Sequence, residues 1–444
     1  MSAAEPGGRF RLERRHWLVL AAAWLGWGFD VFDALLFNYV APNCIPTLLG
    51  LEIGTPAAKA AIVQWNGILT SLLLVGWALG GLIFGQIADR IGRARALLLT
   101  ILIYALATTA CAFAPNLGFL IVFRAIASLG IGGEWAAGAT LVAETVPESR
   151  RITAGALMQS ASPCGLFLAM FVNYQIAGVW FADDPAHSWR YVFLCGLLPA
   201  AAVLAMRLAA LEPSSWKKAR ASGPAGRLSE LFGREYRYAT LSAFSMSVVA
   251  LITWWSFNAF LPTIASGLAL EHAERHGIVG TAALVLAENW KLQATLAFNL
   301  GGLIGSFLTA PVARRFGRRG AFACYFLVAG LALLVMFGLK LEPLTALRAS
   351  FFVGLAAYGV FGIFAFYLPE LFPPRLRATG AGFTYNFGRV FAAGGPFLVG
   401  WVAMQGANAT ASAVQLLFYV GFVPLAALLA VPFIPETRGR RLEA

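Results

Sequence analysis

Two aspartates in the first long apolar segment of the chain are the side chains best placed to carry chemistry. The segment runs from about Trp17 to Val40, and Asp30 and Asp33 lie three residues apart, so a helix would place both on one face. At about 1.5 Å per residue, Asp30 lies roughly 20 Å along a helix that begins at Trp17, well inside a hydrocarbon core of about 30 Å. A carboxylate at this depth is costly, and it is kept for a partner, a water-filled cavity or a proton to carry.

A third membrane acid, Glu134, lies in a later apolar segment, after Arg124. An apolar site favours the protonated form of a carboxyl group, which is what a proton carrier needs. We therefore predict that the coupled proton is carried first by Asp30, second by Asp33 and third by Glu134. The alternative is a structural network in which Arg124 pairs with Asp33 or Asp30. Arg124 is also a candidate for substrate contact or for reaching the membrane surface.

The opposite charge lies in the second half of the chain, where Arg389 stands near the middle of an apolar segment. Asn386 precedes it by three residues and shares its helix face. The planar guanidinium suits a carboxylate better than a lysine would. Because an unpaired guanidinium is costly in lipid, either an internal acid or a substrate anion has to answer it. Neighbouring segments of the second half show no acid, so we predict a substrate anion.

Amide and aromatic side chains within apolar segments are further candidates for substrate contact. Amides there either bond between helices or meet the substrate, and aromatic residues are most often lipid-facing or core residues. We expect one or two of the aromatic residues at the site. The candidates are Gln159, Trp254, Trp255, Asn258, Asn299, Tyr358 and Phe361.

Composition places these residues in a membrane protein with many spans. Of the 444 residues, 59% are hydrophobic and 12% are charged, against about 25% charged in soluble proteins. The net charge of +12 comes mostly from short basic clusters between apolar runs, which is typical of loops facing anionic lipid and argues against a nucleic-acid partner. The five cysteines show no disulfide or metal-ligand spacing, and no nucleophile–base pattern appears. We expect neither an enzyme, nor a metal, nor a cofactor beyond the coupling protons.

About twelve apolar segments are long enough to span as helices, which predicts an all-α fold. They cover residues 17–40, 65–88, 96–114, 117–141, 152–178, 190–211, 239–268, 289–313, 319–340, 346–371, 377–404 and 413–434. With a cytoplasmic N-terminus, 25 of the 33 Lys and Arg residues fall on the cytoplasmic side and 6 on the other, so both termini are predicted inside. A basic insert over 212–238 separates two six-helix bundles, residues 1–211 and 239–444.

The two halves repeat a short motif. GQIADRIGRAR follows the second apolar segment at residues 85–95, and PVARRFGRRG follows the eighth at residues 311–320. When Gly92 is aligned on Gly317, arginines of the first copy coincide with arginines of the second. Repeats of this kind build many carriers, whose site lies between the halves near the middle of the membrane.

The first copy of this motif resembles the signature loop of the major facilitator superfamily. Three further stretches agree with that family: residues 124–132, 369–380 and 435–439. The resemblance implies that charged loops at cytoplasmic helix ends latch the halves together when the outside is open, and the alternative is that they only set topology. The residues expected in this latch are Gly85, Asp89, Arg90, Gly92, Arg93, Glu370 and Arg375. The second copy departs from the pattern by having Arg314 where the first has Asp89.

Within that superfamily the chain is similar to metabolite:proton symporters of the aromatic acid, sialate or monocarboxylate carrier type. The pair Asp30 and Asp33 carries this resemblance, together with Arg124, Glu134 and Arg389. Sugar porters usually have a Gln pair on the seventh helix, and drug antiporters usually have a Gly-Pro motif on the fifth. The chain departs from both patterns.

The resemblance implies a monomeric, multi-pass protein of the inner membrane that imports a small organic anion, such as an aromatic acid or monocarboxylate, by proton symport. Its expected partners are the anion, protons and the lipid bilayer. Protonation of Asp30 or Asp33 together with anion binding at Arg389 would neutralise a central cavity and let the halves rock past each other. The alternatives are a carrier of zwitterions, sugars or drugs on the same fold, including antiport or export, and a membrane sensor that does not transport.

Overall fold

The computed structural model describes residues 13–91, 93–132, 142, 146, 150–197, 228–339, 341–403, 405 and 408–438. Every regular element within these residues is a helix, and they contain no strand. The predicted all-α fold is therefore confirmed.

Residues 13–197, which we call the N-terminal half, form long helices joined by short turns. Their elements are α1 (Arg14–Leu49), α2 (Pro56–Ile91), α3 (Arg93–Cys111), α4 (Leu117–Ile131), α6 (Arg151–Gln159), α7 (Ala161–Asn173), the π-helix η2 (Tyr174–Trp180) and α8 (Pro185–Leu194). The run from α6 to η2 has no intervening loop. It is interrupted at Ser160, because Pro163 lacks the N–H that a continuous helix would use there.

Residues 228–438, which we call the C-terminal half, are built in the same way. Their elements are η3 (Leu228–Phe232), α11 (Arg237–Arg275), α12 (Thr281–Gly338), α13 (Pro343–Arg348), α14 (Ser350–Leu371), α15 (Pro374–Gly382), the π-helix η4 (Phe383–Phe387), α16 (Gly388–Ala392), α17 (Gly394–Ala403), α18 (Ala409–Val420), α19 (Phe422–Ala427) and η5 (Val431–Phe433). The π-helix η4 lies between α15 and α16, whereas the 3₁₀ helices η3 and η5 lie at the two ends of this half.

A backbone break at Gly317 divides α12 into two helices. Gly317 has φ 75° and ψ −175°, a conformation that glycine adopts without strain. A Cβ atom at this position would also lie 2.7 Å from a carboxylate oxygen of Glu436. The break falls between the predicted spans 289–313 and 319–340, so the repeated motif of the sequence marks a real helix boundary.

Seven helices of the described residues are long and apolar enough to cross a membrane, and Leu99–Cys111 and Leu117–Ile131 are shorter apolar helices. Helix overlaps every predicted span, but some predicted boundaries were wrong. α1 continues to Leu49 instead of ending near Val40. It ends at Gly50, whose φ of 67° lets its N–H close the last turn on Pro46 and Thr47.

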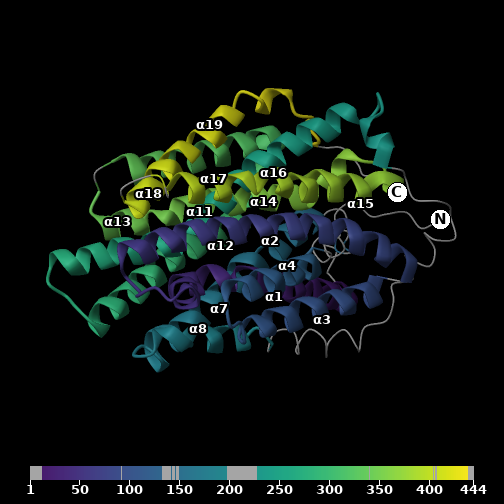
Figure 1. Cartoon of the computed structure of the whole chain (residues 1–444). Coiled ribbons are helices and arrows are strands. Elements are labelled where there is room, and N and C mark those ends of the chain that lie inside the picture. The colour runs from purple at the N-terminus through teal and green to yellow at the C-terminus, as the bar shows by residue number, and fades with distance from the viewer. Residues whose placement is uncertain are drawn as a thin grey trace, which may run out of the picture.

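The two halves lie side by side. In Figure 1 the purple-to-blue helices of the N-terminal half fill the lower part of the view, and α14 to α19 fill the upper part. α1 contacts α11 and α2 contacts α17 across the boundary. The turns near Ile53, Ala182 and Leu284 meet at one end of the molecule, which we call the arginine-poor end. The opposite end, with Arg318 and its neighbours, is the arginine-rich end.

Glycines allow the helices within each half to approach closely. A Cβ atom on Gly130 would lie 2.8 Å from the backbone nitrogen of Tyr104, and one on Gly132 would lie 2.2 Å from the carbonyl oxygen of Trp77. Glycine at these two positions lets α4 and its C-terminal cap pack this closely on α3 and α2.

Candidate functional site

A small cavity lies between the halves. Both halves supply its walls, and most of the side chains are aromatic. The lining consists of Trp27, Val31, Leu35, Trp77, Gln159 and Ser162 from the N-terminal half, and Trp254, Trp255, Tyr358, Phe361, Tyr385 and Arg389 from the C-terminal half. It is an apolar chamber with a single cation among its lining residues, which suits a small anion that has a flat or apolar body.

Arg389 is held in a fixed orientation at this cavity. Its guanidinium carbon lies 4.5 Å from the ring centre of Trp77 and 4.4 Å from that of Tyr385, so a cation–π contact forms on each side. One nitrogen donates to the side-chain oxygen of Asn386. Its Nε has no hydrogen-bond partner among the described residues, although only 1% of Arg389 is exposed. A buried donor in this situation favours an acceptor that arrives with a ligand.

Asp30, in the other half of the molecule, supplies a negative charge that interacts with Arg389. It lies on α1, it is fully buried, and it interacts electrostatically with the Arg389 guanidinium. The partner predicted for Arg389 is a substrate anion, with an internal acid as the alternative. The structure places an internal acid in electrostatic range, contributed by the N-terminal half. This arrangement couples a membrane acid to the cation at the cavity.

Asp33 belongs to a different environment, inside the N-terminal half. Its carboxylate accepts a hydrogen bond of 2.8 Å from the hydroxyl of Thr108 and interacts electrostatically with Arg124. Arg124 also donates to the carbonyl oxygen of Ala34 at 2.7 Å and lies over the ring of Phe37. Asp33 and Arg124 do not line the central cavity, and neither does Asp30, which reaches it only through its interaction with Arg389. The predicted interaction of Arg124 with an acid of the first helix is present, whereas its side chain is not placed for substrate contact.

The remaining substrate candidates divide into three groups. Gln159, Trp254, Trp255, Tyr358 and Phe361 line the cavity, which is more aromatic residues than the one or two expected. Asn386 lies behind the wall, where it holds Arg389. Asn258 and Asn299 are buried but do not line it.

Three lining aromatic residues were not predicted: Trp27, Trp77 and Tyr385. Trp27 precedes Asp30 by three residues and Val31 by four, about one helical turn, so the helix face that carries the acid could have identified it. Tyr385 is next to Asn386 in sequence, and from the π-helix η4 its ring lies against the guanidinium of Arg389. Trp77 has no neighbouring polar residue that would have singled it out.

Most of the predicted latch lies outside the described residues. Gly92 and the predicted proton carrier Glu134 lie outside the described residues. Only the backbone is described for the other members of the latch: Gly85, Asp89, Arg90, Arg93 and Arg375. Glu370 is described, and it pairs with Arg318 at 2.6 Å and accepts from Thr437 at 2.6 Å, both within the C-terminal half. Arg314, which departs from the motif, donates to Thr153 of the N-terminal half at 2.9 Å.

Another polar contact between the halves lies toward the arginine-poor end, and it was not predicted. Lys291 of α12 pairs with Glu288 at 2.8 Å and donates to the carbonyl oxygen of Tyr39 on α1 at 3.1 Å. Asn173 of α7 donates to the same glutamate at 3.1 Å. Lys291 is 2% exposed and Glu288 is 8% exposed, so this is a desolvated ion pair that joins both halves.

Comparisons with known proteins agree on one family. The family model described as "Major Facilitator Superfamily" matches residues 17–396. A probable 4-methylmuconolactone transporter of Cupriavidus pinatubonensis (strain JMP 134 / LMG 1197) is 32% identical, over 95% of this chain and 91% of that protein. A gentisate transporter of Corynebacterium glutamicum is 28% identical, over 86% of this chain and 80% of that protein.

The fold comparison gives the same result. The crystal structure of a D-xylose-proton symporter superposes with a TM-score of 0.69 at 18% identity, covering 96% of this chain and 99% of that one. At this identity the likeness concerns the fold. Together with the family match over most of the chain, it shows that the protein is a membrane transporter, not an enzyme, and that it belongs to the major facilitator superfamily.

Proposed function

We propose that this transporter imports a small organic carboxylate, aromatic or muconate-like, together with a proton across the inner membrane. Twelve spans with both termini in the cytoplasm place the arginine-poor end outside. The observation that carries the proposal is Arg389 held between Trp77 and Tyr385 at an aromatic cavity, with Asp30 in electrostatic range. The relatives named for gentisate and 4-methylmuconolactone transport support this substrate class.

Substrate recognition in this proposal follows from the cavity walls. The carboxylate binds the guanidinium of Arg389, whose Nε is free of hydrogen bonds among the described residues. The flat body of the anion packs against the rings of Trp254 and Phe361. Gln159 supplies an amide for hydroxyl or carbonyl substituents.

Coupling follows from the charges of the buried pair Arg389 and Asp30 and of the ligand beside them. Without substrate, Arg389 and ionised Asp30 sum to zero. With a bound carboxylate, the sum returns to zero only if Asp30 takes up a proton. The two unbalanced states, anion without proton and proton without anion, enclose a net charge, and desolvating an ion costs several kcal/mol. The transporter therefore switches between its outward-open and inward-open conformations mainly in the balanced states. This coupling gives one proton per anion.

Uptake into proteoliposomes tests the proposal. We expect an inward proton gradient to drive accumulation of labelled gentisate, and benzoate and nicotinate to compete. Proline, betaine and xylose serve as probes of the alternative substrate classes. Transport of these solutes without any carboxylate would contradict the proposal, and binding without flux of any solute would indicate a sensor.

The variant Asp30→Asn tests the coupling step. Its cavity is positive when empty and neutral when an anion is bound, so we expect gentisate to bind at least as tightly as in the parent protein. Counterflow of gentisate should continue, whereas accumulation driven by the proton gradient should be lost. Accumulation that still follows the gradient would remove Asp30 from the coupling role.

A further inference from the structure

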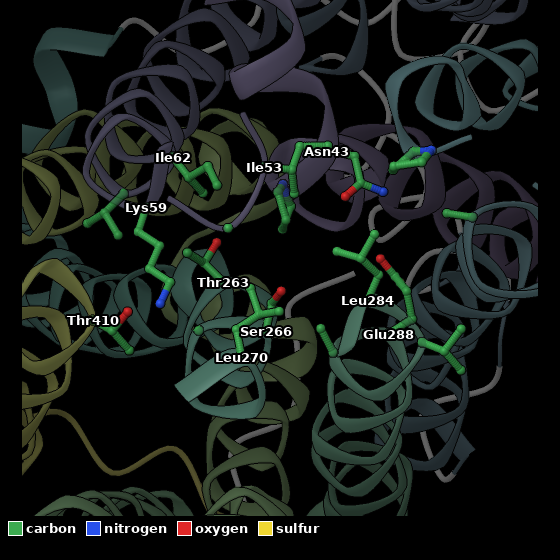
Figure 2. Close-up of a pocket in the computed structure, with 18 of the residues that line it drawn as sticks. Asn43, Ile53, Lys59, Ile62, Thr263, Ser266, Leu270, Leu284, Glu288 and Thr410 are labelled. Atoms are coloured by element: carbon green, nitrogen blue, oxygen red, sulfur yellow. The ribbon is translucent and has the colours of Figure 1, made fainter. Parts of the chain in front are cut away.

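A second cavity opens at the arginine-poor end of the molecule. Figure 2 shows that α1, α2, α11, α12 and α18 contribute to its wall, so both halves surround it. We call it the outer cavity. Trp255 of the central cavity and Thr263 of the outer cavity are eight residues apart on α11, which is about 12 Å along a helix. The outer cavity is therefore stacked on the central one.

Polar contacts between the halves close the layer that separates the two cavities. Asn66 of α2 donates to the carbonyl oxygen of Ala259 on α11. Lys291 reaches Tyr39 beside it, and its partner Glu288 also lines the outer cavity. The outer cavity thus lies directly outside a closed passage to Arg389.

The outer cavity has an excess of positive charge. Its ionisable lining residues are Lys59 and Glu288. Glu288 is neutralised by Lys291 at 2.8 Å, whereas Lys59 forms no ion pair within the described residues. One ammonium group therefore remains to attract an anion.

A buried hydroxyl without a partner adds a second recognition element. Thr263 lines the outer cavity and is 8% exposed, and its Oγ1 has no hydrogen-bond partner among the described residues. Thr410 and Ser266 supply further hydroxyls near it, and Figure 2 shows these groups together with Lys59 around the open space. A buried hydroxyl is normally satisfied, so an unsatisfied one at a cavity indicates a ligand acceptor.

We infer that the outer cavity is a second binding site for carboxylate anions, in which Lys59 and Thr263 hold the carboxylate. The apolar body of the ligand packs against Ile62, Leu270 and Leu284. This role rests on the proposed function: the site collects the substrate before the contact between Lys291 and Tyr39 breaks and the passage to Arg389 opens. Its ligand class, a carboxylate with an apolar body, does not depend on the coupling mechanism.

Alkylation of an engineered cysteine tests the anion preference without using the transported substrate. In Ser266→Cys, iodoacetate and iodoacetamide have nearly the same size but differ in charge. We expect the iodoacetate-to-iodoacetamide ratio of alkylation rates to be about tenfold higher at residue 266 than for 2-mercaptoethanol, an uncharged water-soluble thiol, in the same buffer. Mass spectrometry of the labelled peptide and of the small thiol gives both ratios.

The matched variants are Lys59→Gln and Lys59→Arg in the Ser266→Cys background. The ratio of rates cancels any change in the reactivity of the thiol itself. We expect Lys59→Gln to reduce the ratio to that of 2-mercaptoethanol and Lys59→Arg to preserve it. Equal ratios for residue 266 and 2-mercaptoethanol in the parent, or a raised ratio that survives Lys59→Gln, would overturn the inference.

Protection by gentisate separates this site from the central one. Gentisate should slow alkylation by iodoacetamide at residue 266 in the parent and in Arg389→Ala, but not in Lys59→Gln. If the charge preference holds and gentisate gives no protection, the outer anion site stands and the proposed substrate class fails. If protection disappears in Arg389→Ala and persists in Lys59→Gln, the outer site is wrong and the central one stands.

Discussion

Lys291 on α12 donates to the carbonyl oxygen of Tyr39 on α1 at 3.1 Å, so a buried ammonium group of one half is bonded to the backbone of the other. Its counter-ion Glu288, 2.8 Å away, is in turn bonded to Asn173 of the N-terminal half. When the halves part at this end, both cross-contacts break and the ion pair becomes hydrated. The network therefore stabilises the conformation that is closed at the arginine-poor end.

Removing only the negative partner should be more harmful than removing both charges. Glu288→Gln leaves Lys291 buried without a counter-ion, and we expect a loss of about 3 kcal/mol in stability. In Glu288→Gln with Lys291→Met, most of that loss should be recovered because no buried charge remains. Thermal unfolding in detergent measures both, and Glu274→Gln, at an exposed position, is the control. Equal losses in the single and double variants would contradict a coupled ion pair.

Arg389 should be sensitive even to a change that keeps its charge. Arg389→Lys retains a cation but loses the planar surface that lies 4.5 Å from Trp77 and 4.4 Å from Tyr385. We expect gentisate to bind about tenfold more weakly in Arg389→Lys and not detectably in Arg389→Ala. Isothermal titration measures both affinities, and circular dichroism checks that the helices remain. An unchanged affinity in Arg389→Ala would exclude this residue from the substrate site.

Asp33 and Asp30 should respond differently to the same substitution. Asp33→Asn removes the charge that faces Arg124 inside the N-terminal half, so the main effect should be a lower melting temperature. Proton-driven accumulation of gentisate should persist in Asp33→Asn, while Asp30→Asn should abolish it. Proteoliposomes prepared in parallel give the comparison. If Asp33→Asn melts normally but no longer follows the proton gradient, the proton belongs to Asp33.

The central site could largely be predicted from the sequence because its residues are exceptions in their surroundings. Asp30 and Arg389 are ionisable groups in apolar segments, and the cost of burying them points to function. Trp254 on α11 and Tyr358 on α14 each lie on the face of their helix that lines the central cavity. Trp77 carries no such mark, since a tryptophan in an apolar helix is equally expected in the core.

The contact at the arginine-poor end could not be predicted, for a physical reason. Glu288 lies one residue before the predicted span 289–313, so the pair with Lys291 reads as an ordinary charged helix end. Its burial depends on packing against α1 and α7 of the other half. The carbonyl oxygen of Tyr39 that accepts the hydrogen bond from Lys291 has no sequence signature, because every residue has a backbone carbonyl group.

Glu436 makes the stability of the arginine-rich end dependent on pH. Its carboxylate accepts the backbone N–H groups of Arg318 at 3.0 Å, Arg319 at 3.1 Å and Arg438 at 2.9 Å. Partial burial raises the pKa of Glu436, but these hydrogen bonds and the Arg318 charge outweigh it, so the pKa lies below its usual value of 4.5.

A lowered pKa in the folded state fixes the sign of the effect. The stabilisation is fully present above the pKa of unfolded glutamate and is lost as the pH falls through the lower pKa of the folded state. We therefore expect the parent protein to melt at a higher temperature than Glu436→Gln at neutral pH, with the gap closing below about pH 4.5. Melting curves of both proteins between neutral and acidic pH give the gap directly. A gap that stays constant across this range would mean that Glu436 acts only as a neutral acceptor of the N–H groups that begin the second helix of α12.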